Sequence, residues 1–292
     1  MFPRNIFRER NKVMRKISSN LIENKVAELA IKANTKLRSD VLKLIEQALQ
    51  KEKKPLPKKA LAAIVENAKI AANKKIAICQ DTGLPVVFAE IGREVYLKDD
   101  IRKIITQGIN KGYKQGCLRA SIQKDPITRK SKLTYSPIIS HIDIVKGDKL
   151  KITILPKGFG SENKALVKML NPTASIGDIE DFIVSAVKTA GAGACPPYII
   201  GVGIGGTQDY ACLLAKKSLL KLVTVKNKQK DLAFLEQRLL EKMNKLNIGP
   251  FGFGGKTTVL KVNVLTYPTH IAGLPVAVNI SCHALRSASA II

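Results

Sequence analysis

The stretch GAGACPPYIIGVGIGGT, residues 191–207, places glycine-rich turns on both sides of a continuous apolar run. Apolar residues at helical spacing precede it near 176–190, and a second such pattern follows at 211–222. A change from three-to-four spacing to a short apolar run and back predicts a helix, a buried strand and another helix. This alternation predicts a mixed α/β protein.

Toward the N-terminus, residues 1–75 show helical periodicity, which Pro55 and Pro57 interrupt before the pattern resumes at 61–72. Residues 76–92 then predict a strand, a turn at Gly83 and a second strand. We therefore expect a helical N-terminal layer packed on a mixed-sheet core with glycine-rich loops.

Between residues 92 and 191, the spacing of apolar residues predicts a helix over 100–123. The runs IISHIDIV (138–145) and KLKITILP (149–156) predict two strands joined at Gly147-Asp148. A further helical pattern covers 232–246.

Composition narrows the class of protein. Apolar residues make up 45% of the 292 positions and charged residues 25%, which is ordinary for a globular chain. No uninterrupted apolar run approaches the roughly 18 residues that a membrane span needs, so we expect no membrane association.

The net charge of +26 comes from 49 basic against 23 acidic residues and would attract polyanions. The lysines are scattered, however, and no arginine-rich patch interleaved with aromatic residues forms a base-stacking platform. A solvated lysine-rich surface is therefore favoured over a nucleic-acid site, and a positive field also suits small dianionic substrates.

The five cysteines are Cys79, Cys117, Cys195, Cys212 and Cys282. Their odd number and wide spacing predict reduced thiols in a reducing compartment, and no C-x-x-C motif supports a zinc ribbon or a ferredoxin-type cluster. Three of them lie in unusual settings of small residues, CQDTG, GAGACPP and NISCHA. Each alone reads as a small buried hydrophobe, but three such settings together favour ligation. Cys117 and Cys212 stand in apolar, helix-like contexts, and we expect them in the core.

Six motifs in order carry a family resemblance: CQDTG, GCLRASI, PKGFGSENK, GAGACPPYIIGVGIGGT, GPFGFGGKTT and HIAGLPVAVNISCHALR. Together they resemble the α subunit, or N-terminal catalytic domain, of the class I fumarase and L-tartrate dehydratase family, over roughly residues 20–290. The resemblance implies a [4Fe-4S] cluster whose three irons are bound by Cys79, Cys195 and Cys282. The fourth iron would be left open to act as a Lewis acid on substrate.

The same resemblance implies roles for neighbouring residues. Asp81 and His270 would be catalytic, and the resemblance favours this role of Asp81 over the turn-capping use that D-T-G alone indicates. Gln80, Arg119 and Gly158 would contact substrate, with the arginine fork suited to a carboxylate.

Phe159, His283 and two glycine-rich motifs are further features of these segments. Phe159 stands where relatives often have glycine, so this substrate-contacting loop departs from the family pattern at that position. His283 follows a proposed ligand and could orient it. The GIGG (203–206) and GFGG (252–255) motifs fit no phosphate-binding pattern and predict tight turns.

The function expected from the resemblance is reversible addition of water to a small dicarboxylate, with fumarate/(S)-malate first and L-tartrate as the alternative. A non-enzymatic binder of nucleic acid or another polyanion is the alternative from a different class. We expect a basic extension at 1–20, a single catalytic domain over 21–292, and a cytoplasmic location. A β subunit in an α2β2 assembly would supply the missing base, and neither nucleic acid nor membrane is expected as a partner.

Overall fold

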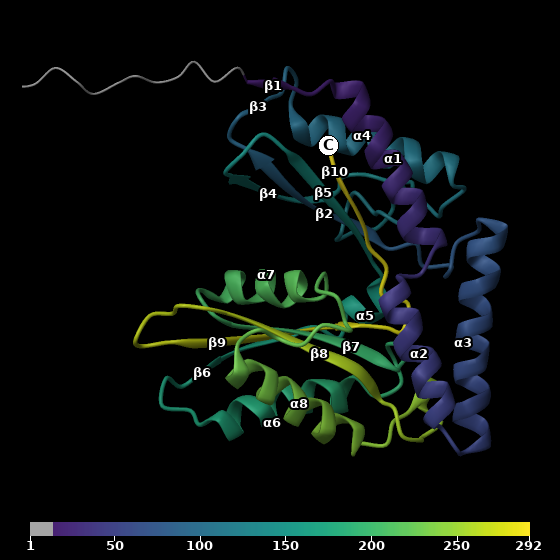
Figure 1. The fold of residues 1–292 in the computed structure, drawn as a ribbon, viewed down its shortest axis with the longest axis vertical. Helices are drawn as coiled ribbons and strands as arrows, with labels where there is room; N and C mark the ends of the chain where they lie inside the picture. The colour runs from purple at the N-terminus through teal and green to yellow at the C-terminus, as the bar shows by residue number, and fades with distance from the viewer. Residues whose placement is uncertain (1–13) are drawn as a thin grey trace, which may run out of the picture. The chain divides into compact units, whose positions relative to one another are not determined.

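Helices and strands are mixed along residues 14–292, the part of the chain that the computed structural model describes (Figure 1). The mixed α/β class is thereby confirmed. Two compact units share the chain, one built from the described residues up to Lys32 with Pro85–Ile154 and Ala288–Ile292, the other from Ala33–Leu84 and Leu155–Ser287. Residues 1–13 of the expected basic extension lie outside the described residues. The rest of that extension contains β1 (Arg15–Lys16) and the start of α1 (Ser19–Thr35).

The N-terminal helices follow the predicted periodicity. After α1 come α2 (Ser39–Lys51) and α3 (Pro55–Lys74), which pack against each other in the second unit. The expectation that helix resumes only at residue 61 is wrong, because Pro55 begins α3. A proline is tolerated in the first helical turn, where its missing N–H would have no partner anyway.

The first unit contains a four-stranded sheet in the order β10-β5-β2-β4 and helix α4 (Ile101–Gln115). Its strands are β2 (Leu84–Gly92), β4 (Ile139–Val145), β5 (Leu150–Lys157) and β10 (Ala288–Ile291), while β3 (Val95–Tyr96) pairs with β1 in a separate parallel ribbon. Both strands predicted over 138–145 and 149–156 are present and are connected through Gly147-Asp148, but they do not pair as a hairpin, because β2 lies between them. The apolar β2, buried along most of its length, takes an inner position and pairs in parallel with β4.

Residues 76–83 form no strand, contrary to the sequence prediction. Their backbone groups bond to helical residues instead of to a sheet: Ile78 N–H donates to the carbonyl of Asn34 at 2.9 Å, and the Asn67 side-chain amide donates to the Ile78 carbonyl at 2.9 Å. Because these donors and acceptors are satisfied locally, the segment lies against the helices as an irregular loop.

The second unit is built on a sheet in the order β6-β9-β7-β8, with α7 on one face and α6 and α8 on the other (Figure 1). Its elements are α5 (Phe159–Glu162), β6 (Leu166–Leu170), α6 (Ile176–Ala190), β7 (Tyr198–Gly205), α7 (Gln208–Ser218), α8 (Lys230–Asn244), η1 (Pro250–Gly252), β8 (Val259–Tyr267) and β9 (Leu274–Ser281). The glycines of β7 let α7 approach closely. A Cβ at Gly201 would lie 2.1 Å from the Ala215 carbonyl oxygen.

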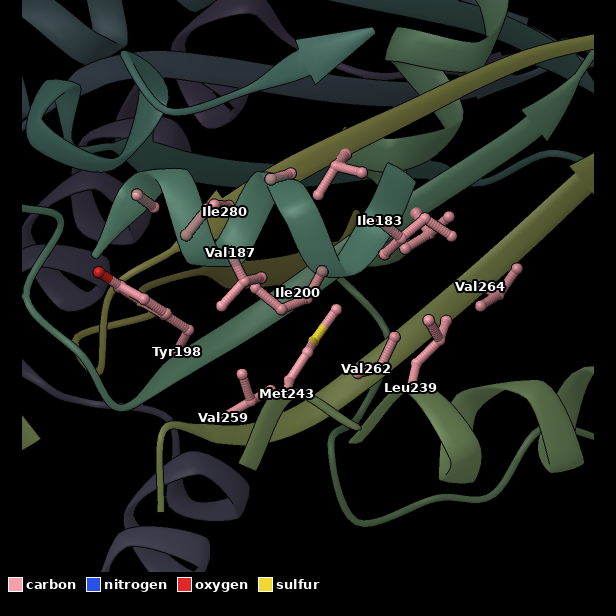
Figure 2. Packing of buried hydrophobic residues seen from close by; sticks show 14 of the residues in the cluster. Ile183, Val187, Tyr198, Ile200, Leu239, Met243, Val259, Val262, Val264 and Ile280 are labelled. Carbon is pink, nitrogen blue, oxygen red and sulfur yellow. The ribbon is translucent and has the colours of Figure 1, made fainter. Parts of the chain in front are cut away.

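The core of this unit fills the space between the sheet and the helices α6 and α8 (Figure 2). Ile183 and Val187 of α6 meet Leu239 and Met243 of α8 over the apolar face of the strands. Alternation along β9 sends Val276, Val278 and Ile280 into this core and turns Ala277 toward α7. No helix within residues 14–292 is long and apolar enough to cross a membrane.

Candidate active site

Antiparallel pairing of β7 and β9 brings two of the three candidate cysteines to one end of the β6-β9-β7-β8 sheet. Cys195 lies shortly before β7 and Cys282 directly after β9, and the register places Ile199 opposite Ser281. The backbone N–H of His283 donates to the Cys195 carbonyl at 3.3 Å, and the His283 ring Nδ1 lies 3.0 Å from the same oxygen. The two cysteine loops are therefore joined directly.

Tyr198 braces the glycine-rich loop that leads to Cys195. Its hydroxyl donates to the Gly191 carbonyl at 2.6 Å and accepts from the Ala194 N–H at 3.3 Å. Burial raises the pKa of Tyr198 to about 12, so the hydroxyl keeps its proton and remains a donor.

The glycine-rich turn before β8 contacts the loops of both Cys195 and Cys282. Phe251 N–H donates to the Pro196 carbonyl at 3.0 Å, and the Phe251 ring meets the His283 ring edge-on at 5.3 Å. Gly252, Gly254 and Gly255 all have positive φ, which confirms the tight turn expected at GFGG. Glu52 anchors this turn by accepting from Lys256 N–H at 2.7 Å.

The loop carrying Cys79 is tied to the same region through Asp81. Arg286, four residues after Cys282, donates from Nη2 to the Asp81 carbonyl at 2.8 Å. The Asp81 carboxylate accepts from Gly83 N–H at 2.9 Å and from Phe159 N–H at 2.8 Å. The turn-capping use of Asp81 is therefore present, and the second bond also joins it to the loop that begins at Gly158.

The three thiols lie within electrostatic range of one another. Burial raises the pKa of Cys195, and the thiols of Cys282 and Cys79 raise it further. Burial also raises the pKa of Cys282, although the cations Arg286 and Lys157 oppose that shift. Burial lowers the pKa of His283 to about 4, so its ring is neutral at neutral pH and its Nδ1–H can donate to the Cys195 carbonyl.

The residue types near the cysteines suit a thiolate-bound cluster, because cysteine thiolates are the usual ligands of iron–sulfur clusters. Within residues 14–292, no three side chains of the His, Cys, Asp and Glu types lie close enough to hold one metal ion. Two cations beside Cys282 also suit a group that carries negative charge.

Lys157 is a site residue that the sequence reasoning missed. Its side chain is buried and its amine donates to Ser161 Oγ at 2.8 Å and to the Ile280 carbonyl at 2.9 Å. Its ion pair with Glu162 spans 3.3 Å, and Glu162 is also bonded by Lys216 and Asn279. A lysine at the end of the apolar strand KLKITILPK was the available signal, because a buried lysine requires a partner.

Of the predicted residues in the second unit, the structure brings Gln80 but not His270 to the cysteines. Gln80 does lie beside Cys79, and its Oε1 is 3.8 Å from the Cys79 sulfur. His270 lies in the exposed turn between β8 and β9, at the opposite end of β9 from Cys282. The eight residues of β9 separate the two by about 26 Å. Arg119 belongs to the first unit, where it follows α4 as an exposed residue.

The two remaining cysteines contradict the expectation that they belong to the core. Cys117 and Cys212 are both exposed. Cys117 lies just beyond the end of α4 with a φ of 50°, so the helix expected over 100–123 ends before it.

Comparison with known proteins agrees with this arrangement of motifs. The family model for fumarate hydratase (Fumerase) matches residues 23–291. The "Putative L(+)-tartrate dehydratase subunit alpha" of Methanocaldococcus jannaschii is 40% identical over 275 residues, covering 91% of this chain and 96% of the relative. The L(+)-tartrate dehydratase subunit alpha of Escherichia coli strain K12 is 26% identical over 270 residues, covering 91% of this chain and 89% of the relative.

The family match spans almost the whole chain and includes the three cysteine loops, the Asp81 turn and the loop after β5. The chain belongs to the fumarate hydratase (Fumerase) family and is a hydro-lyase.

Proposed function

We propose that this chain is the α subunit of a [4Fe-4S]-dependent hydro-lyase acting on a small dicarboxylate. The observation that carries the proposal is that the Cys195 and Cys282 loops join at one end of a sheet, while Arg286 bonds the Asp81 carbonyl and so ties the Cys79 loop to them. Cys79, Cys195 and Cys282 are the proposed ligands of the cluster. When bound, the cluster would supply a Lewis acid for the substrate hydroxyl.

The residues around the cysteines have separate proposed roles. Backbone N–H groups of Gly83 and Phe159 hold the Asp81 carboxylate in one orientation, as a group that exchanges a proton with the hydroxyl needs. Gly158 presents backbone without a side chain beside that carboxylate, since a Cβ there would lie 3.3 Å from Asp81 Oδ2. The Gln80 amide and the Arg119 guanidinium are the proposed contacts to the substrate carboxylates.

His270 keeps its proposed catalytic role on one condition. Because β9 separates it from Cys282 within one chain, the proposal requires His270 to act in the site of a second copy. An assembly containing at least two α subunits meets that condition, as the proposed α2β2 form would.

L-Tartrate now ranks ahead of fumarate/(S)-malate as the proposed substrate. The relatives named above carry the tartrate dehydratase name, while the family model carries the fumarate hydratase name. The names of the relatives also specify an alpha subunit, which supports a β subunit as partner. A single catalytic domain over 21–292 and a cytoplasmic location are proposed with it. The polyanion-binder alternative is set aside because the chain belongs to an enzyme family.

Anaerobic reconstitution with iron and sulfide tests the proposal, and the chain supplies matched controls. Replacement of Cys79, Cys195 or Cys282 by serine should abolish the visible Fe–S absorption, whereas Cys117→Ser and Cys212→Ser, at exposed positions, should retain it. The reconstituted chain is then assayed with a candidate β subunit on L-tartrate, fumarate and mesaconate. A colourless wild-type protein, or full activity of the α chain alone, contradicts the proposal.

A further inference from the structure

Arg286 is a buried cation that forms no ion pair with a carboxylate among the described residues. Only 3% of the residue is exposed. Its Nη2 donates to the Asp81 backbone carbonyl at 2.8 Å and its Nη1 to Asn34 Oδ1 at 3.3 Å, and both acceptors are neutral. No hydrogen-bond partner reaches its Nε within residues 14–292.

Two other buried cations of the second unit form ion pairs with carboxylates. Arg38 lies 2.5 Å from the Asp40 carboxylate, with both side chains almost fully buried. Lys157 lies 3.3 Å from the Glu162 carboxylate. Leaving a charge buried without a counter-charge is strongly destabilising, so Arg286 is the exception that needs an explanation.

The surroundings of Arg286 indicate where its counter-charge belongs. The residue follows Cys282 by four positions and is one of the two cations that act electrostatically on the Cys282 thiol. A Cβ at Gly158 would lie 3.6 Å from its Nη2 and 3.3 Å from Asp81 Oδ2, so the Asp81 carboxylate is near Arg286 although no ion pair joins the two. Arg286 thus lies where the loops of Cys79 and Cys282 and the loop beginning at Gly158 meet.

We propose that Arg286 is a positioning residue whose buried charge balances the negative charge of the thiolate-bound cluster while its Nη2 fixes the Asp81 backbone. The inference rests on the proposed function, because it assigns the missing counter-charge to the cluster. It predicts a particular thermodynamic pattern: Arg286 is poorly compensated in the apo-protein and well compensated in the loaded protein. Binding of the cluster should therefore stabilise the wild-type fold more than it stabilises a variant without this charge.

Arg286→Gln and Arg286→Met remove the charge, Arg286→Lys retains it, and Arg38→Gln is the matched control at a buried arginine paired with a carboxylate. Each protein is measured without the cluster and after anaerobic reconstitution. The measured quantities are the thermal unfolding midpoint, the rate of iron loss to a chelator and the reduction potential of the cluster.

For the variants at position 286 without charge, we expect the midpoint rise on reconstitution to fall by at least half and iron loss to be at least tenfold faster. The reduction potential should become more negative, because a neighbouring positive charge favours the reduced cluster. Arg286→Lys should restore the potential. Arg38→Gln should lower the midpoint of both forms equally and leave the potential unchanged.

Equal midpoint rises and equal potentials in Arg286→Gln and the wild type would overturn the inference. So would failure of both uncharged variants to fold without the cluster, because a guanidinium required by the apo-protein is not awaiting a counter-charge. Failure of the proposed function itself is recognised separately, by a wild-type chain that takes up no cluster.

Discussion

The ring Nδ1 of His283 lies 3.0 Å from the carbonyl oxygen of Cys195, so a single side chain joins the loops of two candidate ligands. Replacing His283 with alanine should remove this bond and the edge-on contact with Phe251. Loss of one hydrogen bond should lower the free energy of unfolding of the apo-protein by about 1 kcal/mol. Urea denaturation measures that loss, and chelator challenge should show faster iron release.

His283→Asn is the matched variant, because an amide N–H can occupy the place of Nδ1–H. It should release iron more slowly than His283→Ala. Equal release from the two variants would show that the bond to Cys195 does not position the loops.

The separation of His270 from Cys282 leads to a prediction about the assembly. Asp81→Asn and His270→Ala should each be inactive alone, since each removes a proposed catalytic group from both sites of a dimer. Co-expression of the two variants should restore about a quarter of the wild-type activity, because half of the dimers are mixed and each holds one intact site. Steady-state assays with the β subunit measure the recovery.

The control is co-expression of Asp81→Asn with Cys195→Ser. Both residues are proposed to serve the same chain's site, so a mixed dimer contains no intact site and activity should stay absent. Recovery in the control, or none with His270→Ala, refutes action of His270 in the site of another copy.

Gly255 should tolerate no side chain. Its φ is 101°, and a Cβ would lie 2.6 Å from the Glu52 carboxylate oxygen that accepts from the Lys256 N–H. Gly255→Ala should therefore strain the backbone and displace Glu52, lowering the free energy of unfolding by about 1–3 kcal/mol. Gly160→Ala is the control, because nothing lies within 4 Å of a Cβ at that position. Chemical denaturation of both apo-proteins should show a clear loss only for Gly255→Ala.

Asp40 should govern part of the acid stability of the second unit. Burial alone would raise the pKa of Asp40, but hydrogen bonds from Arg38 and from the Val223 N–H, together with the Arg38 charge, hold it below its usual value of 3.8. A carboxyl whose pKa is depressed by folding contributes stability above its unfolded pKa and loses it as pH falls through the folded pKa. In Asp40→Asn, the free energy of unfolding should therefore fall less as the pH is lowered.

Urea denaturation of apo-protein from about pH 6 down to about pH 3 follows this loss. At neutral pH, breaking the buried pair should cost about 3 kcal/mol, because Arg38 is left without a counter-charge. If the free energy of unfolding of Asp40→Asn fell with pH as steeply as that of the wild type, Asp40 would have the same pKa in the folded and unfolded chain.

Local pattern predicted much of the fold. Apolar spacing placed the helix at 176–190 and the strand that became β7, because an amphipathic helix and a buried strand each leave their own period in the sequence. The same reasoning failed at 76–83, where an apolar segment satisfies its backbone through Asn34 and Asn67 instead of through a sheet. It found the strands β4 and β5 but not their partners, since the choice of strand partner depends on residues that are distant in the chain.

The sequence by itself determined the residue types of the site: three cysteines in small-residue settings, an aspartate beside the first, and the resemblance that named them. Only the tertiary structure decided which of these meet. The antiparallel register of β7 and β9 brings Cys195 and Cys282 together, and the same strand carries His270 to the far end. The tertiary structure also singled out Arg286, because the sequence does not show whether the charge of a buried arginine is paired in the folded chain.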